Sequence, residues 1–217
     1  MGRKFYSFTI LTVLVFFGTM CTRNKSRQEK FWEWFSKNEK HIYENVESEK
    51  LQKQIFNDIS SQLAKIDQNL VFEFSPIRKN NIREFSISAD GIKESFPSVE
   101  NLIKSSPKLT NWKFSAFRQR VPNDNYEIQY KEYNIGYDDI FYRYSTSNNE
   151  FGIELNIKNY DGSAGMQDAI YVLLDGLLGE YDVVMNINWI DWKKLDENES
   201  NKLHNLIELR ALIDSRK

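Results

Sequence analysis

The clearest hydrophobic pattern in the chain lies between residues 51 and 66. Leucine and isoleucine recur there every three or four residues, with polar side chains between them, which predicts an amphipathic helix. A second apolar stripe with helical spacing consists of Phe31, Trp34, Phe35 and Ile42. We expect these two helices to form a helical hairpin over residues 31–67, with its apolar side buried against a sheet.

Four of the five residues from Phe31 to Phe35 are aromatic, and this cluster has two interpretations. A helix lying in a membrane interface has aromatic side chains opposite a strongly basic face. Here glutamates are mixed with the lysines around the cluster, so the polar face is not strongly basic. The pattern therefore favours packing in a core, with membrane contact as the alternative.

Beyond the helical hairpin, the apolar positions change to the alternation that is typical of strands. Strands are expected at 70–77 and 82–88, and another begins at Trp112. A short helix lies before this last strand and starts near Pro97, because a proline needs no N–H partner in the first helical turn. The order is strand, strand, helix, strand, a ββαβ unit over residues 70–118.

The same order recurs in the second half of the chain, over residues 139–192. Its expected elements are strands at 139–146 and 151–157, a helix at 166–178 and a strand at 181–192. We interpret the recurrence as an internal duplication. Since few residues are identical between the halves, convergent patterning is the alternative. A connecting strand at 126–130 and a terminal helix at 200–214 complete the prediction.

These elements together predict an α+β fold with mainly antiparallel sheet and packed helices, in a single domain over residues 31–217. The 217-residue chain is 41% hydrophobic and 14% aromatic, which is typical of a globular protein. The helix at 166–178 is apolar nearly all round and should be the most buried element.

Two stretches of the first ββαβ unit carry a resemblance to a known group of proteins. ISADGIKESFPSVENLIKSSPKL (87–109), followed by WKFSAFR (112–118), resembles the core of a family of uncharacterised bacterial proteins. Many of these begin with an aromatic segment similar to FWEWFSKNE (31–39). The resemblance covers residues 31–195. It brings no assigned activity and implies no catalytic residue.

The N-terminus has the pattern of a signal peptide over residues 1–20. Arg3 and Lys4 precede an uncharged apolar run from Phe5 to Met20. As a helix, this run would extend about 24 Å, short of the ~30 Å hydrocarbon core of a bilayer. This length favours an export signal over a spanning helix.

Cys21, the single cysteine of the chain, directly follows this segment and resembles the lipid-modified residue of bacterial lipoproteins. In that group the signal peptide is cut before the cysteine, and lipid is attached to it. Gly18-Thr19-Met20 departs from the usual leucine at the third position before the cysteine and the usual small residue just before it. The resemblance implies lipidation of Cys21, a polar tether over 21–30, attachment to a membrane and a place in the bacterial cell envelope. An uncleaved N-terminal anchor and ordinary secretion are the alternatives.

Composition excludes several classes of function. The formal net charge is −2 and no basic face stands out, so we expect no nucleic-acid partner. One cysteine and two histidines allow neither an internal disulfide nor a His/Cys metal cluster. The glycine-rich stretch from Asp161 to Gly165 lacks the lysine of a phosphate loop and does not complete a dinucleotide fingerprint. We therefore predict neither a metal nor a cofactor.

Three aspartates form the candidate polar site. Asp175 lies among leucines of the apolar helix, and a buried carboxylate with a raised pKa is a candidate functional group. The structural alternative is an ion pair with Arg83, Arg118 or Arg143. Asp161 precedes the same helix, where it or Ser163 would act as an N-cap. Asp90 precedes a glycine, and an aspartate in that position usually forms a turn.

No reaction signature emerges from these residues, and three classes of function follow. The leading hypothesis is a non-catalytic envelope protein that binds a protein or a small molecule through its sheet or through the tyrosine-rich region 126–144. The alternatives are a carboxylate-dependent hydrolase and an immunity-type protein that neutralises a toxin through an acidic patch around Asp138-Asp139.

Overall fold

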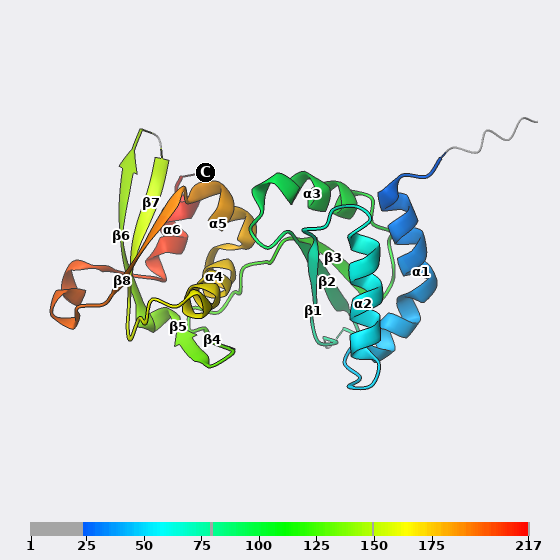
Figure 1. The fold of residues 1–217 in the computed structure, drawn as a ribbon, viewed down its shortest axis with the longest axis horizontal. Helices are drawn as coiled ribbons and strands as arrows, with labels where there is room; N and C mark the ends of the chain where they lie inside the picture. Colours follow the sequence, from blue (N-terminus) through cyan, green and yellow to red (C-terminus); the bar gives the residue numbers. More distant parts are fainter. Residues whose placement is uncertain (1–23, 79, 149, 217) are drawn as a thin grey trace, which may run out of the picture.

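The structure, a computed structural model, describes residues 24–78, 80–148 and 150–216. Two ββαβ units lie side by side along the longest axis of the molecule (Figure 1). Each unit has its own sheet and its own cluster of buried hydrophobic side chains. The predicted α+β class, with helices at the N-terminus, is confirmed.

The N-terminal unit contains a three-stranded sheet in the order β1-β2-β3. Its strands and crossover are β1 (Val71–Phe74), β2 (Arg83–Ser88), a 3₁₀ turn (Lys93–Ser95), α3 (Phe96–Lys104) and β3 (Trp112–Ala116). β1 pairs antiparallel with β2, in a register that sets Phe74 opposite Phe85. β2 pairs parallel with β3, because the helix between them returns the chain to the same end of the sheet.

Two N-terminal helices cover this sheet, α1 (Arg27–Asn45) and α2 (Gln52–Leu63). Phe35 of α1 is fully buried and stacks on Phe85 of β2 with 5.1 Å between ring centroids. Trp32 is buried too, and its indole N–H donates to the carbonyl of Leu102 over 2.7 Å. Core packing of the aromatic cluster is therefore confirmed. The buried stripe of α1 differs from the predicted one in one position: it includes Trp32, whereas Trp34 is only partly buried at its edge.

The C-terminal unit contains a four-stranded sheet in the order β8-β7-β6-β9. Its elements are β6 (Ile140–Ser147), β7 (Glu150–Ile157), α4 (Ala164–Leu178), α5 (Glu180–Asn186), β8 (Trp189–Lys194), β9 (His204–Asn205) and α6 (Glu208–Asp214). β6 and β7 are antiparallel, and β7 and β8 are parallel, with α4 and α5 in the crossover. This is the connectivity of the N-terminal unit repeated.

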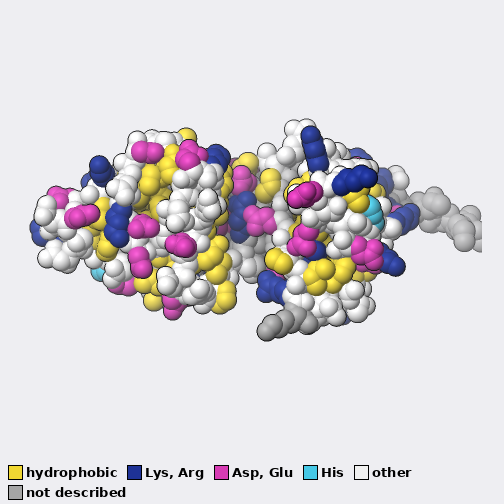
Figure 2. All heavy atoms as spheres, turned by 90° about the horizontal axis from the view of Figure 1, so that it is seen from below, with side chains coloured by type: hydrophobic (Ala, Val, Ile, Leu, Met, Phe, Trp, Pro, Cys, Tyr) yellow, Lys and Arg dark blue, Asp and Glu magenta, His cyan; other side chains and the backbone are white. Residues whose placement is uncertain are grey.

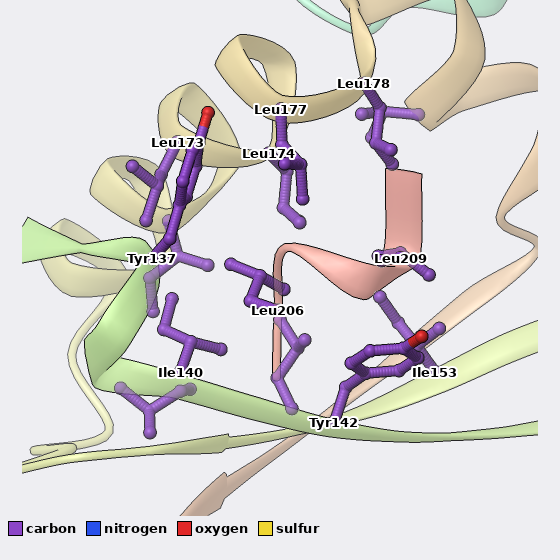
Figure 3. Packing of buried hydrophobic residues seen from close by; sticks show 14 of the residues in the cluster. Tyr137, Ile140, Tyr142, Ile153, Leu173, Leu174, Leu177, Leu178, Leu206 and Leu209 are labelled. Atoms are coloured by element: carbon purple, nitrogen blue, oxygen red, sulfur yellow. The ribbon is translucent and has the colours of Figure 1, made fainter. Parts of the chain in front are cut away.

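α4 forms the centre of the C-terminal core, as its apolar sequence predicts. Figure 3 shows its leucines directed toward Leu206 and Leu209, with Tyr142 and Ile153 of the sheet below them. A small hairpin of β4 (Glu127–Tyr130) and β5 (Tyr133–Gly136) packs on another side of α4. β5 was not predicted, because only its Ile135 is fully buried and its pattern is short.

Two predicted elements are wrong. The strand expected over 181–192 is a helix in its first half, α5, and a strand only from Trp189. Val183 of α5 packs into the C-terminal core and Val184 contacts the N-terminal core, so tertiary contacts outweigh the strand preference of valine. The terminal helix expected over 200–214 begins only at Glu208. It follows a 3₁₀ segment (Glu197–Lys202) and the short strand β9.

α1 begins at Arg27, so the last four residues of the predicted 21–30 tether are helical. Ser26 caps the helix by accepting the Glu29 backbone N–H over 3.1 Å, and the Glu29 carboxylate accepts the Ser26 N–H in return. The predicted signal peptide and Cys21 lie outside the described residues. Among the residues that are described, no helix has the length and apolar character needed to cross a membrane.

Candidate functional site

A cleft of about 520 Å³ lies where the two units meet. The turn after β2 forms its N-terminal side, and α4, α5 and the start of β8 form its C-terminal side. Acidic and basic side chains gather at this junction in the view of Figure 2. The lining is apolar along α5 and β8 and charged around the turn and α4. Its charged members are Asp90, Arg118, Asp168 and Asp175.

Arg118 joins the two units. It follows β3, and its Nε donates to Glu73 of β1 over 2.6 Å. One terminal nitrogen, Nη1, donates both to Asp90 of the turn over 3.0 Å and to Asp175 of α4 over 3.2 Å. Burial opposes the charge of the guanidinium, but its bonds to Glu73 and Asp90 outweigh this effect and raise the pKa of Arg118. Arg118 is therefore charged at every physiological pH.

Glu180 forms a second link between the units. Its side chain is fully buried at the start of α5. One carboxylate oxygen accepts the backbone N–H groups of Ala89 (3.3 Å) and Gly91 (3.0 Å), and the other accepts that of Arg118 (3.1 Å). The Glu180 backbone N–H donates in turn to the Arg118 carbonyl over 3.1 Å. Hydrogen bonds to a charged acceptor are stronger than neutral ones, so this link fixes the turn that forms one wall of the cleft.

The pKa of the Asp175 carboxyl is raised to about 7, chiefly by burial and to a lesser extent by the negative charges of Glu180 and Asp90, while Arg118 opposes the shift. The carboxyl is 10% exposed and borders the cleft. Near neutral pH it is therefore present in both protonation states. A group poised in this way can donate or accept a proton, or respond to the charge of a bound ligand.

The apolar wall of the cleft carries both aliphatic and aromatic side chains. Tyr171 of α4 is 44% exposed and lines the cleft together with Val184 and Ile190. Such surface is available to an apolar ligand. Trp189 lies flat over Gly152 of β7, where a Cβ atom would overlap the indole ring. The Trp189 indole lies on the face of the sheet opposite to α4, because its register partner is Gly152 and not the core residue Ile153.

The structure brings two of the three predicted aspartates together. Asp90 and Asp175 share one nitrogen of Arg118, and of the three arginines proposed as partners of Asp175 it is Arg118 that forms the ion pair. Asp161 lies elsewhere: its carboxylate accepts the Ser163 backbone N–H over 2.8 Å and the Tyr133 hydroxyl over 3.1 Å. The Ser163 hydroxyl caps α4 by accepting the Met166 N–H. Asp161 thus has a turn-forming role.

The other surfaces considered in the sequence are mostly occupied by internal contacts. Of the tyrosines in region 126–144, Tyr130 lines the cleft, while Tyr126 and Tyr133 lie against glycines of α4 and Tyr142 is buried. In the predicted acidic patch, Asp139 pairs with Lys158 over 3.4 Å and accepts the Gly136 N–H. Within the described ranges, no group of three or more His, Cys, Asp or Glu side chains is arranged to hold a metal ion.

Sequence reasoning missed Glu180 and Tyr171 as parts of this site. One signal for Glu180 was present: Gly179 follows an apolar helix as a C-cap, and the acidic residues Glu180 and Asp182 come next. Acidic residues are favoured in the first turn of a helix, so this pattern indicates a new helix rather than a strand. Comparison of the chain with protein-family models, with curated proteins and with solved structures found no match.

Proposed function

We propose that the protein is a non-catalytic binding module that holds a small ligand in the cleft between its two ββαβ units. The observation that carries the proposal is the cleft itself. It combines an aromatic and aliphatic wall with a compact set of charged groups, and its volume is about 520 Å³. Small-molecule sites in proteins typically have this mixture and measure ~300–1,000 Å³.

The hydrogen bonds around the cleft support a pre-formed site. Arg118 and Glu180 tie the turn after β2 to α4 and α5. Both walls of the cleft are thereby held in register before any ligand enters. A pre-formed site loses less conformational entropy on binding than a flexible one, which favours a small molecule as the occupant.

The experiment is native mass spectrometry of the full-length protein purified from the cells that produce it. A matched variant, Val172→Trp, places a large side chain on the half-buried α4 wall of the cleft. We expect a small-molecule adduct on the wild type and its loss from the variant. An adduct retained equally by both proteins, or no adduct on either, contradicts the proposal.

A second candidate function, a carboxylate-dependent hydrolase, is supported by one observation. The Asp175 carboxyl has a pKa of about 7 and borders the cleft, which suits a general acid. The test is to incubate the wild type with the small molecule recovered from the adduct and to follow its mass. Conversion by the wild type but not by Asp175→Asn favours the enzyme, and an unchanged mass favours the binding module.

For the location of the protein, we propose export and attachment to the bacterial cell envelope through lipid on Cys21. The proposal rests on the basic and apolar pattern of residues 1–20 and on the position of Cys21 directly after it. Intact mass and membrane fractionation of the wild type are compared with those of Cys21→Ala. A lipid mass increment that the variant lacks supports the proposal. An unmodified Cys21 contradicts it.

A further inference from the structure

The charges around Arg118 do not balance. One guanidinium serves three carboxylates, those of Glu73, Asp90 and Asp175, and Glu180 adds a fourth acidic group on the Arg118 backbone N–H. Arg118 is the one basic residue in the described lining of the cleft. The cluster therefore carries surplus negative charge beside an apolar wall. Burial is the largest cause of the raised pKa of Asp175, and the charges of Glu180 and Asp90 add to it.

The edge of the cleft already accommodates an ammonium group of the protein itself. The Lys131 Nζ lies 5.0 Å from the centroid of the Tyr130 ring and 3.6 Å from a carboxylate oxygen of Asp168. Tyr130 and Asp168 both line the cleft. An aromatic face together with a carboxylate is a recurrent site for alkylammonium groups, because both attract the positive charge.

We infer that the ligand of this cleft is a small organic cation, with an amine held by the carboxylates beside Arg118 and an apolar body on the wall formed by Tyr171, Val184 and Ile190. The inference rests on the proposed function, because it names the class of ligand for the same cleft. Asp90 is the carboxylate best placed to receive the amine. It is 63% exposed and keeps only one oxygen on Arg118.

The charge pattern also predicts which ligands bind weakly in the cleft. An anion would have to approach Arg118 through the carboxylates that already surround it, and like charges in a partly buried site repel strongly. A neutral molecule of the same shape can pack against the apolar wall, but it does not neutralise the surplus negative charge of the carboxylates. The expected order of affinity is therefore cation, then neutral molecule, then anion.

The test uses three probes that share a phenyl ring and differ in charge: phenethylamine, phenethyl alcohol and hydrocinnamate. Their dissociation constants are measured by NMR titration of the full chain. We expect phenethylamine to bind about tenfold more tightly than the alcohol, which corresponds to about 1.4 kcal/mol, and hydrocinnamate to bind most weakly. Added salt reduces the preference, because it screens the charges.

Two matched variants test whether the preference for phenethylamine depends on a carboxylate in the cleft. Asp90→Asn removes a charge from the cleft, and asparagine tolerates the positive φ of 51° at this position. Asp191→Asn removes the same charge from an exposed site on β8 that does not line the cleft. We expect Asp90→Asn to reduce the tenfold preference severalfold and Asp191→Asn to leave it unchanged.

The outcomes separate this inference from the proposed function. Equal binding of all three probes, tighter binding of hydrocinnamate, or an equal effect of both variants overturns the cation inference. In that case, loss of probe binding in Val172→Trp still supports the cleft as a binding site. Absence of binding by all three probes at millimolar concentration overturns both.

Discussion

Truncation of Glu180 to alanine is expected to weaken the junction between the two units more than any other single change to a side chain there. The carboxylate accepts three backbone N–H groups from two separate segments, Ala89 and Gly91 on one side and Arg118 on the other. Alanine removes the acceptor of all three. Because the site is fully buried, water replaces the lost carboxylate only partly.

The magnitude follows from these contacts. A hydrogen bond to a charged group contributes about 1.5–3 kcal/mol, and a buried donor left without a partner costs about 1–3 kcal/mol. Ala89 is fully buried, whereas the other two donors lie in partly buried positions. We therefore expect Glu180→Ala to lower the free energy of unfolding by about 3–5 kcal/mol, a large part of the ~5–15 kcal/mol typical of a domain.

Glu180→Gln is the matched control. Its amide oxygen can still accept the N–H groups of Ala89 and Gly91, but its NH₂ group then faces the N–H of Arg118. We expect a smaller loss, about 1–2 kcal/mol. The assay is urea unfolding followed by tryptophan fluorescence and by circular dichroism. An alanine variant within ~1 kcal/mol of the wild type would refute the stabilising role assigned to Glu180.

Three further predictions concern residues around the cleft. The pKa of Asp175 is raised to about 7 in the folded protein against ~3.9 in an unfolded chain, so its contribution to stability is present at low pH and is lost as the pH rises from about 4 to 7. The Asp175→Asn variant lacks this titration. Its free energy of unfolding, measured relative to that of the wild type by urea titration, should therefore rise with pH by up to about 4 kcal/mol. A difference that stays constant with pH contradicts the raised pKa of Asp175. Gly179 has φ 84° and ψ 139°, a conformation that costs a residue with a Cβ atom about 1–3 kcal/mol. Gly179→Ala should therefore lower the midpoint of thermal unfolding by several degrees. An unchanged midpoint would show that the break between α4 and α5 tolerates a side chain. Gly152→Ala should displace the Trp189 ring that lies over it and change the tryptophan emission. Phenethylamine binding should be unchanged, because this ring lies on the face of the sheet opposite to α4; unchanged emission would contradict this packing of the ring.

Most of the fold follows from local patterns in the sequence. The apolar spacing of α1 and α2, the alternation in β1, β2, β3, β6 and β7, and the apolar character of α4 each come from residues close together in the chain. Each of these elements was predicted near its observed place. α5 was not, because Val183 and Val184 favour a strand locally. Their helical conformation depends on the two cores that they contact on opposite sides.

The candidate site was predictable only in its separate parts. Asp175 stood out as a carboxylate among leucines, and Asp90 as a turn residue. Arg118 binds Asp175, which is 57 residues away in the chain, and Asp90, which is 28 residues away. No local sequence pattern predicts contacts between residues so far apart. The cleft belongs to neither unit alone, so it emerges only when both units are placed together.

Binding of a small ligand in the cleft between the units can be observed by protein-detected NMR with a library of soluble aromatic and aliphatic fragments. We expect fragments to shift the signals of Gly91, Val172 and Val184 together, and Val172→Trp to abolish these shifts. Fragment-induced shifts that cluster elsewhere on the molecule, or that persist unchanged in Val172→Trp, would show that the cleft is not the binding site.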